Sequence, residues 1–204
     1  MSQFIVGVTG GIGSGKSEVM RRFQAQGIEA FDADDMARVV VEPGRPALDD
    51  IVKKLGPDML TAQGELNRPA LRALVFSNPK VKRWLEQRLH PLINQELEQR
   101  LARAQSPYAL LVSPLLFESE QNQLVDRVLV VDAPRELQLA RASRRDNSDP
   151  QQIEAIIDSQ MSREARLSRA NDVVDNAAGR AELDQQVGKL HNRYLTLCNA
   201  NSHD

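Results

Sequence analysis

The sequence lacks three features that define large classes of proteins: paired cysteines, long apolar runs and a strong charge of one sign. Its one cysteine, Cys198, allows neither an internal disulfide framework nor a zinc site of clustered cysteines, and we interpret it as an inert thiol. No apolar run approaches the roughly 20 residues that span a bilayer. The formal net charge is −2, which argues against general nucleic-acid binding, because such proteins usually carry a basic excess.

The N-terminus also lacks the marks of a secretory signal. Met1-Ser2-Gln3-Phe4 carries no basic residue and runs directly into an apolar segment, so we expect no signal peptide and a cytoplasmic protein. A length of 204 residues suits one hydrophobic core that carries a smaller appended subdomain.

Short apolar segments and helical periodicity alternate along most of the chain. Segments typical of buried parallel strands span residues 4–9, 28–31, 108–112, 128–131 and 172–176. The spacing predicts helices over 17–26 and 134–145, another opening at 149–150, and a closing helix around 183–195. Because alternating strands and helices imply parallel crossovers, we predict a three-layer α/β fold with a central parallel sheet of about five strands.

The block from residue 35 to 103 differs, because it contains helices and turns but no predicted strand. Asn67 and Asn78 each stand where a helix is expected to start. Pro91 lies within a long helical series and predicts a kink near His90. We interpret the block as an insertion over the C-terminal edge of the sheet, where ligands bind in open α/β folds.

A glycine-rich segment follows the first predicted strand. Gly10-Gly11-Ile12-Gly13-Ser14-Gly15-Lys16-Ser17 matches the P-loop pattern, with a strand before it and a helix after it. Such a loop wraps a polyphosphate with backbone N–H groups, and side chains at its glycines would block that approach or forbid the dihedral angles. Lys16 is then expected to bind the β- and γ-phosphates, and Ser17 to bind Mg²⁺. A chance glycine-rich turn would not explain the Lys-Ser pair.

Motifs of other nucleotide-binding proteins are missing. A GTPase switch needs a guanine-reading Asn-Lys-x-Asp and an Asp-x-x-Gly after a strand, and neither occurs in the chain. A large motor or transporter ATPase would normally be longer and carry an apolar run that ends in Asp-Glu. We therefore expect a P-loop kinase for a small molecule, whose reaction needs an aligned acceptor, neutralised charge and a base.

Two carboxylates follow the second predicted strand. Asp32 or Asp34 could reach an acceptor hydroxyl or the Mg²⁺ shell at the sheet edge. Alternatively, the two residues cap a helix that begins near Asp35.

Three arginines fall within a turn and a half of a predicted helix. They are Arg141, Arg144 and Arg145, and the fork of donors on arginine suits a transferring phosphoryl group. Arg141 and Arg145 can share a face toward the site. The alternative is a solvated basic face.

Several short motifs occur in a fixed order along the chain. They are Thr9-Gly10-Gly11-Ile12-Gly13-Ser14-Gly15-Lys16-Ser17, Asp32-Ala33-Asp34 with Ala37-Arg38, Gly64-Glu65-Leu66-Asn67-Arg68, Leu89-His90-Pro91, Pro114-Leu115-Leu116-Phe117-Glu118, Gln138-x-x-Arg141-x-x-x-Arg145-Asp146 and Asp172-Val173-Val174-Asp175-Asn176. In this order they resemble the dephospho-CoA kinase family nearly from end to end. The P-loop alone is generic, whereas Asp-Ala-Asp, His-Pro and Pro-Leu-Leu-Phe-Glu make the resemblance specific.

The resemblance implies an enzyme that uses ATP and Mg²⁺ to phosphorylate the ribose 3′-hydroxyl of dephospho-CoA, the last step of coenzyme A synthesis. It implies Asp34 as the general base, with Lys16 and Arg145 as further catalytic residues. Residues expected at ATP are Gly11, Ile12, Gly13, Ser14, Gly15, Lys16, Ser17, Glu18, Arg141 and Arg145, and Ser17 is the expected metal ligand. Residues expected at the acceptor are Asp32, Asp34, Arg38, His90, Pro91, Leu116 and Glu118.

The same resemblance suggests how the chain is organised. We interpret residues 1–204 as one P-loop kinase domain, with a helical acceptor-binding insertion at 35–103 and a helical lid at 138–170. Residues 171–204 would supply the final strand and the closing helix.

Two residues depart from the family pattern. Glu18 stands where Thr or Ser is expected, which removes a hydroxyl near the α-phosphate and adds a negative charge, so ATP affinity should fall unless Glu18 turns outward. Asn171 replaces an expected Asp at a peripheral position.

Other interpretations stay open at this point. From the residues alone, His90 would be a surface imidazole and Glu118 a loop carboxylate in solvent. The chain could also be another small-metabolite or nucleotide kinase, or a regulatory module that binds ATP without phosphoryl transfer. The acceptor-side carboxylate and the lid arginines weigh against the regulatory module.

Overall fold

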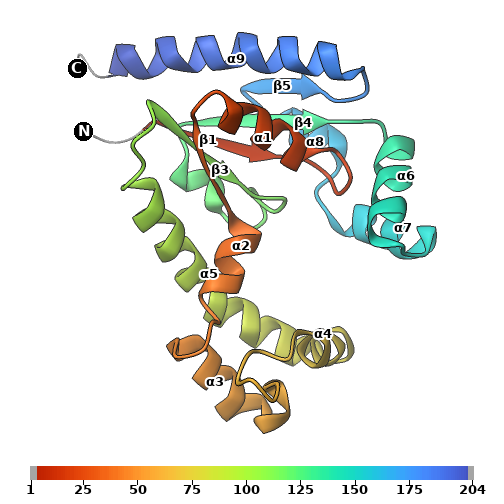
Figure 1. Cartoon of the computed structure of the whole chain (residues 1–204). Coiled ribbons are helices and arrows are strands. Elements are labelled where there is room, and N and C mark those ends of the chain that lie inside the picture. The colour runs from red at the N-terminus through yellow and green to blue at the C-terminus, as the bar shows by residue number, and fades with distance from the viewer. Residues whose placement is uncertain (1–3, 202–204) are drawn as a thin grey trace. The chain divides into compact units, whose positions relative to one another are not determined.

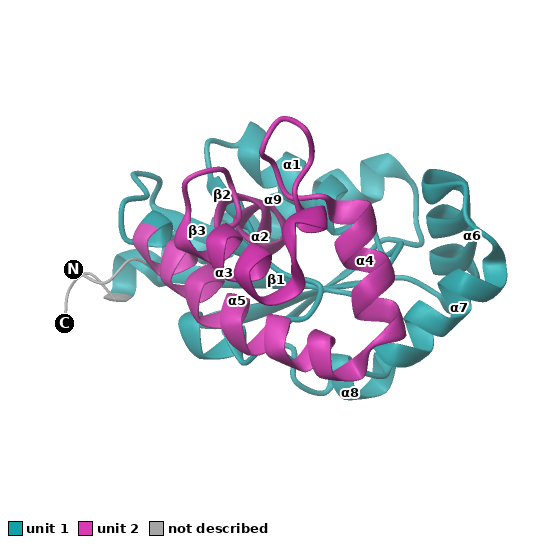
Figure 2. Ribbon diagram, turned by 90° about the horizontal axis from the view of Figure 1, so that it is seen from below, with its two compact units in different colours: residues 1–32, 100–204 teal, residues 33–99 magenta. Residues whose placement is uncertain are grey.

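The computed structural model describes residues 4–201, so the expectations for residues 1–3 and 202–204 lie outside it. The chain divides into two compact units (Figure 2). Residues 1–32 and 100–204 form the first, here named the sheet unit. Residues 33–99 form the second, the helical unit.

The sheet unit contains all five strands of the sheet (Figure 1). The strands are β1 (Phe4–Thr9), β2 (Glu29–Asp32), β3 (Tyr108–Val112), β4 (Arg127–Asp132) and β5 (Asp172–Asp175). Its helices are α1 (Lys16–Ala25), α6 (Arg135–Asp146), α7 (Pro150–Ser159), α8 (Arg163–Leu167) and α9 (Arg180–Asn201), with a 3-10 turn η2 at Gln121–Leu124. Each of the five predicted strands is present, within one residue or so of its expected ends.

All neighbouring strands pair in parallel, in the order β2-β3-β1-β4-β5. The predicted α/β fold with a parallel sheet of five strands is confirmed. In this register Thr9 pairs with Val130 and Asp132 with Asp175, so the strands end at one common edge. The polar residues that follow the strands therefore gather there, as expected for ligand binding in an open α/β sheet.

The core of the sheet unit lies between the sheet and the pair of helices α1 and α9 (Figure 1). Phe23 of α1, Tyr108 of β3 and Tyr194 of α9 are fully buried, with ring centroids 5.5–6.5 Å apart. Each such side chain contributes about 1.5–3 kcal/mol through burial alone. This aromatic cluster fixes α1, and with it the end of the glycine-rich loop, against the strands.

The buried carboxylate of Asp172 lies at the start of β5, away from the edge where the strands end, and joins β5 to β4 and α9. The Asp172 side chain is 2% exposed and accepts hydrogen bonds from Arg127 Nε, from Arg193 Nη1 at 2.7 Å and from the Tyr194 hydroxyl at 3.1 Å. The bond to Asp172 raises the pKa of Arg127, and burial raises the pKa of Tyr194. The preceding residue, Asn171, accepts a 2.7 Å hydrogen bond from the Val128 amide, which gives it a structural role.

The helical unit contains α2 (Ala33–Val39), α3 (Pro46–Leu55), a 3-10 turn η1 (Pro57–Met59), α4 (Arg68–Ser77) and nearly all of α5 (Pro79–Leu101). Both predicted helix starts are confirmed. The Asn67 side chain accepts a hydrogen bond from the Ala70 amide at 3.2 Å, and the Asn78 side chain accepts one from Lys80 at 3.1 Å. The α5 helix is assigned as one continuous helix through Pro91. Among residues 4–201, no helix has the length and apolar character needed to cross a membrane.

Candidate active site

The glycine-rich loop connects the end of β1 to the start of α1. Gly13 and Gly15 adopt φ values of +72° and +95°, which favour glycine. Lys16 folds back over the loop, where its Nζ donates to the carbonyl oxygens of Gly10 at 2.9 Å and Gly11 at 3.1 Å. The ammonium group therefore lies across the loop, next to the space that a bound phosphate would occupy.

The loop glycines also pack closely against the protein that surrounds them. A Cβ atom at Gly11 or Gly13 would collide with Gln138, and one at Gly15 would collide with the Asn176 side chain. Phosphate approach and dihedral angles are one cause for glycine at these positions. The structure adds close packing against α6 and the residue after β5 as a second cause.

The α1 helix starts at the loop with its amide end open. Gly15 is the N-cap, and no side chain in the described part of the chain caps the helix. The free amides and the positive end of the helix dipole form an anion site of the kind that binds phosphate. Ser17, the expected metal ligand, is exposed in the first turn.

Glu18 is held by two arginines of its own helix. Its carboxylate pairs with Arg21 at 2.7 Å and with Arg22, which also pairs with Asp184 of α9 at 2.6 Å. The hydrogen bond from Arg22 lowers the pKa of Glu18. The negative charge beside the loop is thus compensated by these two arginines.

Asn176 links the loop to the helix that carries the predicted arginines. Its side chain donates to the Ser14 carbonyl at 2.7 Å in a buried bond, and its own carbonyl accepts from Arg141 Nη2 at 3.0 Å. Arg141 Nη1 is buried and has no hydrogen-bond partner among residues 4–201. Sequence reasoning named Asn176 only as part of a motif and missed this role.

Arg145 has a different partner. Its guanidinium makes two hydrogen bonds of 2.7 Å to the Asp146 carboxylate, and the contact raises the pKa of Arg145. Arg144, the third arginine of the group, is exposed. The three side chains therefore occupy three distinct environments rather than one basic face.

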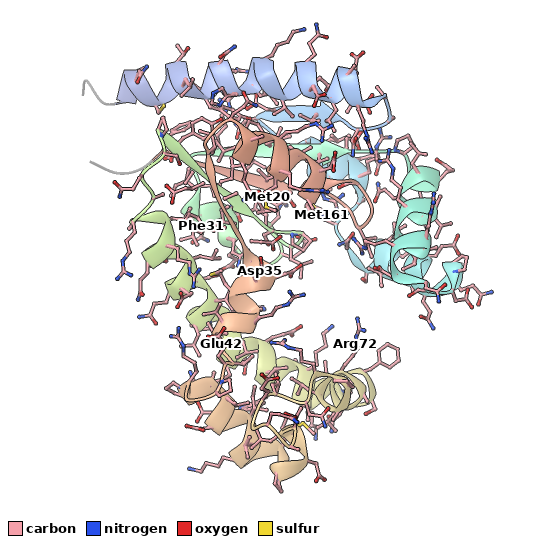
Figure 3. The ribbon with its side chains drawn as sticks, in the orientation of Figure 1. Met20, Phe31, Asp35, Glu42, Arg72 and Met161 are labelled. Atoms are coloured by element: carbon pink, nitrogen blue, oxygen red, sulfur yellow. The ribbon has the colours of Figure 1, made fainter. Side chains whose placement is uncertain are left out.

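A segment between α7 and α8, inside the region predicted as a lid, also reaches the loop through contacts that were not predicted (Figure 3 labels Met161). Gln160 Oε1 accepts from the Ile12 amide at 2.9 Å. Arg163 forms a bidentate pair with Asp132 at 2.8 and 2.6 Å, which raises the pKa of Arg163. A pocket of about 440 Å³ lies beside the segment and is lined by Gly11, Pro134, Arg135, Glu136, Gln138, Ile157, Asp158, Gln160, Met161, Ser162, Arg163, Glu164 and Arg166.

The residues predicted at the acceptor fall in both units. Asp32 ends β2 in the sheet unit, whereas Asp34 and Arg38 lie on α2 and His90 and Pro91 on α5, all exposed in the helical unit. The α2 helix begins at Ala33 rather than near Asp35, so Asp34 lies inside its first turn and does not precede it as a cap.

Leu116 and Glu118 belong to the loop after β3. Leu116 is fully buried against Gly7, so its side chain has no exposed surface with which to contact a ligand. Glu118 is exposed, and its Oε1 accepts from the Met161 amide at 3.0 Å. Glu118 is therefore an exposed carboxylate that is held by the Met161 amide.

Comparison with known proteins places this geometry in one family. The dephospho-CoA kinase family model matches residues 4–182. The chain belongs to the dephospho-CoA kinase family. A curated dephospho-CoA kinase from Shewanella oneidensis is 48% identical over 205 residues, covering 100% of both chains.

Two solved structures are similar to this chain over nearly its whole length. A crystal structure from Thermus thermophilus is 32% identical with a TM-score of 0.82, covering 95% of this chain and 98% of that one. A dephospho-CoA kinase from Campylobacter jejuni is 28% identical with a TM-score of 0.71, covering 97% and 98%. The protein is therefore a kinase, and ATP is the phosphoryl donor that a P-loop kinase family implies.

The residues present fit a magnesium ion that arrives with the nucleotide. Among residues 4–201 there is no cluster of three or more His, Cys, Asp or Glu that could hold a metal. Mg²⁺ does not need such a cluster, because it keeps several waters and uses few protein oxygens together with substrate phosphates. The exposed Ser17 hydroxyl is suited to be one of those oxygens.

Proposed function

We propose that this protein transfers the γ-phosphoryl group of ATP to the ribose 3′-hydroxyl of dephospho-CoA, giving coenzyme A in the last step of its synthesis. The observation that carries the proposal is the preformed phosphate loop, with Lys16 Nζ bonded across it at 2.9 and 3.1 Å, in a chain of this family. A loop already in this conformation loses little entropy when it binds a triphosphate.

The donor side of the proposed site uses the loop, α1 and α6. The loop from Gly11 to Ser17 surrounds the phosphates, with Glu18 close by on α1. The backbone amides of this loop donate to phosphate oxygens, apart from the Ile12 amide, which Gln160 holds. Lys16 exchanges its loop carbonyls for the β- and γ-phosphates, and Ser17 holds Mg²⁺, which neutralises developing charge. Arg141 and Arg145 complete the donor side, and the buried, unpartnered Arg141 Nη1 supports a ligand contact there.

The acceptor side of the proposal rests on the residues that the family motifs assign to it. Asp34 accepts the proton of the 3′-hydroxyl as that oxygen attacks the γ-phosphorus, and the bond to the β-phosphate oxygen breaks to release ADP. In this proposal the residues that bind the acceptor are Asp32, Arg38, His90, Pro91 and Glu118. The buried Leu116 anchors the loop that carries Glu118. The insertion at 35–103 binds the acceptor, residues 138–170 act as a lid, and 171–204 complete the domain.

The experiment is an ADP-release assay with a panel of acceptors. It compares dephospho-CoA with nucleoside monophosphates and sugars, in the presence of Mg²⁺. We expect turnover with dephospho-CoA, a product identical to coenzyme A by ³¹P NMR, and loss of turnover in Lys16→Ala. Turnover with another acceptor only would indicate a different metabolite kinase, and ATP binding without turnover would indicate a regulatory module; either result overturns the proposal.

A further inference from the structure

The end of α7 contacts the phosphate loop through one side chain. Gln160 directly follows α7, is half-buried, and accepts a hydrogen bond from the Ile12 amide at 2.9 Å, although 148 residues separate the two in sequence. Gln160 and Gly11 also line the same pocket of about 440 Å³. The contact therefore lies at the wall of the donor site.

The residues after Gln160 are anchored on both sides of the backbone. The Met161 amide donates to Glu118 at 3.0 Å, and the Met161 carbonyl accepts from Arg166 Nη2 at 2.7 Å. Arg166 is 5% exposed, and burial lowers its pKa. Met161 thus binds the loop after β3, and the residue before it, Gln160, binds the loop after β1.

A second anchor ties the segment to β4. Arg163 pairs through both oxygens with Asp132, the last residue of that strand. Since β3, β1 and β4 are adjacent in the sheet, the contacts join the segment to the loops after β3 and β1 and to the end of β4. These contacts hold the backbone beside Gln160 in place. A side chain held in this way can preorganise the glycine-rich loop that it binds.

The uncharged carboxamide of Gln160 suits a position beside phosphates. Ile12 is half-buried in the middle of the glycine-rich loop, and its amide has an acceptor in Gln160. A carboxamide oxygen supplies that acceptor without charge. A carboxylate in the same place would repel the triphosphate.

We propose that Gln160 is a positioning residue of the donor site, which holds the phosphate loop in its binding conformation through Ile12. The inference rests on the proposed binding of ATP by this loop. Because the bond serves bound substrate and transition state alike, its loss should raise the KM for ATP and leave kcat nearly unchanged.

The first test needs no activity. In ¹⁵N-isoleucine-labelled protein without nucleotide, hydrogen exchange of the Ile12 amide is followed by NMR. Gln160→Met keeps the length of the side chain but removes the acceptor, so Ile12 should exchange at least about fivefold faster, consistent with one lost hydrogen bond. Gln160→Glu keeps an acceptor oxygen and should restore the slow exchange. Gln152→Met, an exposed position on α7, is the matched control and should exchange as wild type does.

The second test is kinetic. Gln160→Met should raise the KM for ATP about three- to tenfold, with the KM for dephospho-CoA and the melting temperature close to wild type. Unchanged Ile12 exchange, or equal rises in both KM values with a lower melting temperature, would overturn the inference. Wild-type protein without turnover on dephospho-CoA would instead overturn the proposed function, and the exchange measurement would still decide the role of Gln160.

Discussion

Asp34 and Asp35 are adjacent, exposed carboxylates in the first turn of α2. They differ in their neighbours, because Asp35 pairs with Arg38 at 3.4 Å on the same helix. Only Asp34 is proposed to accept the proton of the acceptor hydroxyl. The pair therefore offers a comparison of two adjacent, exposed carboxylates in one helical turn.

Asp34→Asn should lower kcat by at least about 100-fold, because a general base contributes that much or more. The same change at Asp35 should leave kcat within a few-fold of wild type. Steady-state assays with ATP and dephospho-CoA measure both, with circular dichroism to check folding. If Asp34→Asn retained most of the wild-type kcat, Asp34 would not be the base that accepts the proton of the acceptor hydroxyl.

His191 gives a pH dependence of stability. Its Nδ1 lies 2.7 Å from the Tyr108 hydroxyl, and burial lowers the pKa of His191 below its ordinary 6.5. The unfolded chain then binds a proton at His191 more readily than the folded protein does. The stability that His191 contributes is present above pH 6.5 and is lost as the pH falls through the lowered folded pKa.

The His191→Gln variant should therefore show a smaller drop in the free energy of unfolding between about pH 7.5 and about pH 5.5 than wild type shows. Urea titrations at the two pH values measure this. His90→Gln, an exposed position on α5, serves as the control and should keep the wild-type difference. An identical drop in His191→Gln and wild type would contradict the assignment.

At the scale of elements, the phosphate loop depends on α6 and on the residue after β5 as much as on its own sequence. Gly13 and Gly27 have similar dihedral angles, with φ of +72° and +83°. A Cβ atom at Gly13 would strike the Gln138 backbone, whereas one at Gly27 has nothing within 4 Å. The two positions separate the cost of the backbone angle from the cost of the collision.

Both Gly13→Ala and Gly27→Ala should lose about 1–2 kcal/mol of stability from the left-handed backbone. Gly13→Ala should lose more, because the loop must move away from Gln138, and its ATP affinity should fall at least about tenfold. Urea unfolding and calorimetric ATP titration measure the two effects. Equal losses of stability and equal ATP affinities in the two variants would show that the collision with Gln138 is relieved at no cost in free energy.

The elements that sequence predicts well are those with a local cause. Apolar runs that end in glycine, in aspartate or, for β3, in Ser113-Pro114 define the five strands. Asn67 and Asn78 define helix starts through bonds to amides two or three residues ahead. The short α8 was not predicted, because its five residues carry no apolar periodicity and its one local signal is the Ser162 side chain at the Ala165 amide.

The contacts around the phosphate loop could not be predicted in the same way. Asn176 reaches Ser14 across 162 residues and Gln160 reaches Ile12 across 148, so their meeting depends on strand order. Leu116 shows the reverse difficulty, because its place in a motif suggested a ligand contact while its exposure is 0%. The order of the motifs identified the family. The order of the strands in the sheet determines which side chains meet the phosphate loop.

At the scale of the whole molecule, Asp172 connects β4, β5 and α9 at the edge of the sheet opposite the phosphate loop. Its position at the start of β5 separates it from the site, since the strands are parallel and end at the loop. It is therefore expected to affect stability and not chemistry.

Asp172→Asn should cost about 3 kcal/mol of stability, because removing one partner of a buried ion pair leaves the others uncompensated. The folded fraction should keep the wild-type kcat. Asp175→Asn, at the exposed far end of the same strand, is the control and should cost less than about 1 kcal/mol. Urea unfolding monitored by tyrosine and tryptophan fluorescence measures both; a small loss at Asp172 would show that its bonds to the arginines contribute little.

The place of β1 in the sheet has a consequence for how the chain is made. This strand is the first to leave the ribosome, yet it lies between β3 and β4, and Phe4 pairs with Tyr108. The whole helical unit is synthesised before either neighbour exists, and its own contacts lie within residues 33–99. Since local contacts form faster than distant ones, the amides of α3 to α5 should become protected before those of β1 in pulse-labelled refolding. A nascent chain that stops before β4 would then carry the complete glycine-rich loop and still be unable to hold a nucleotide.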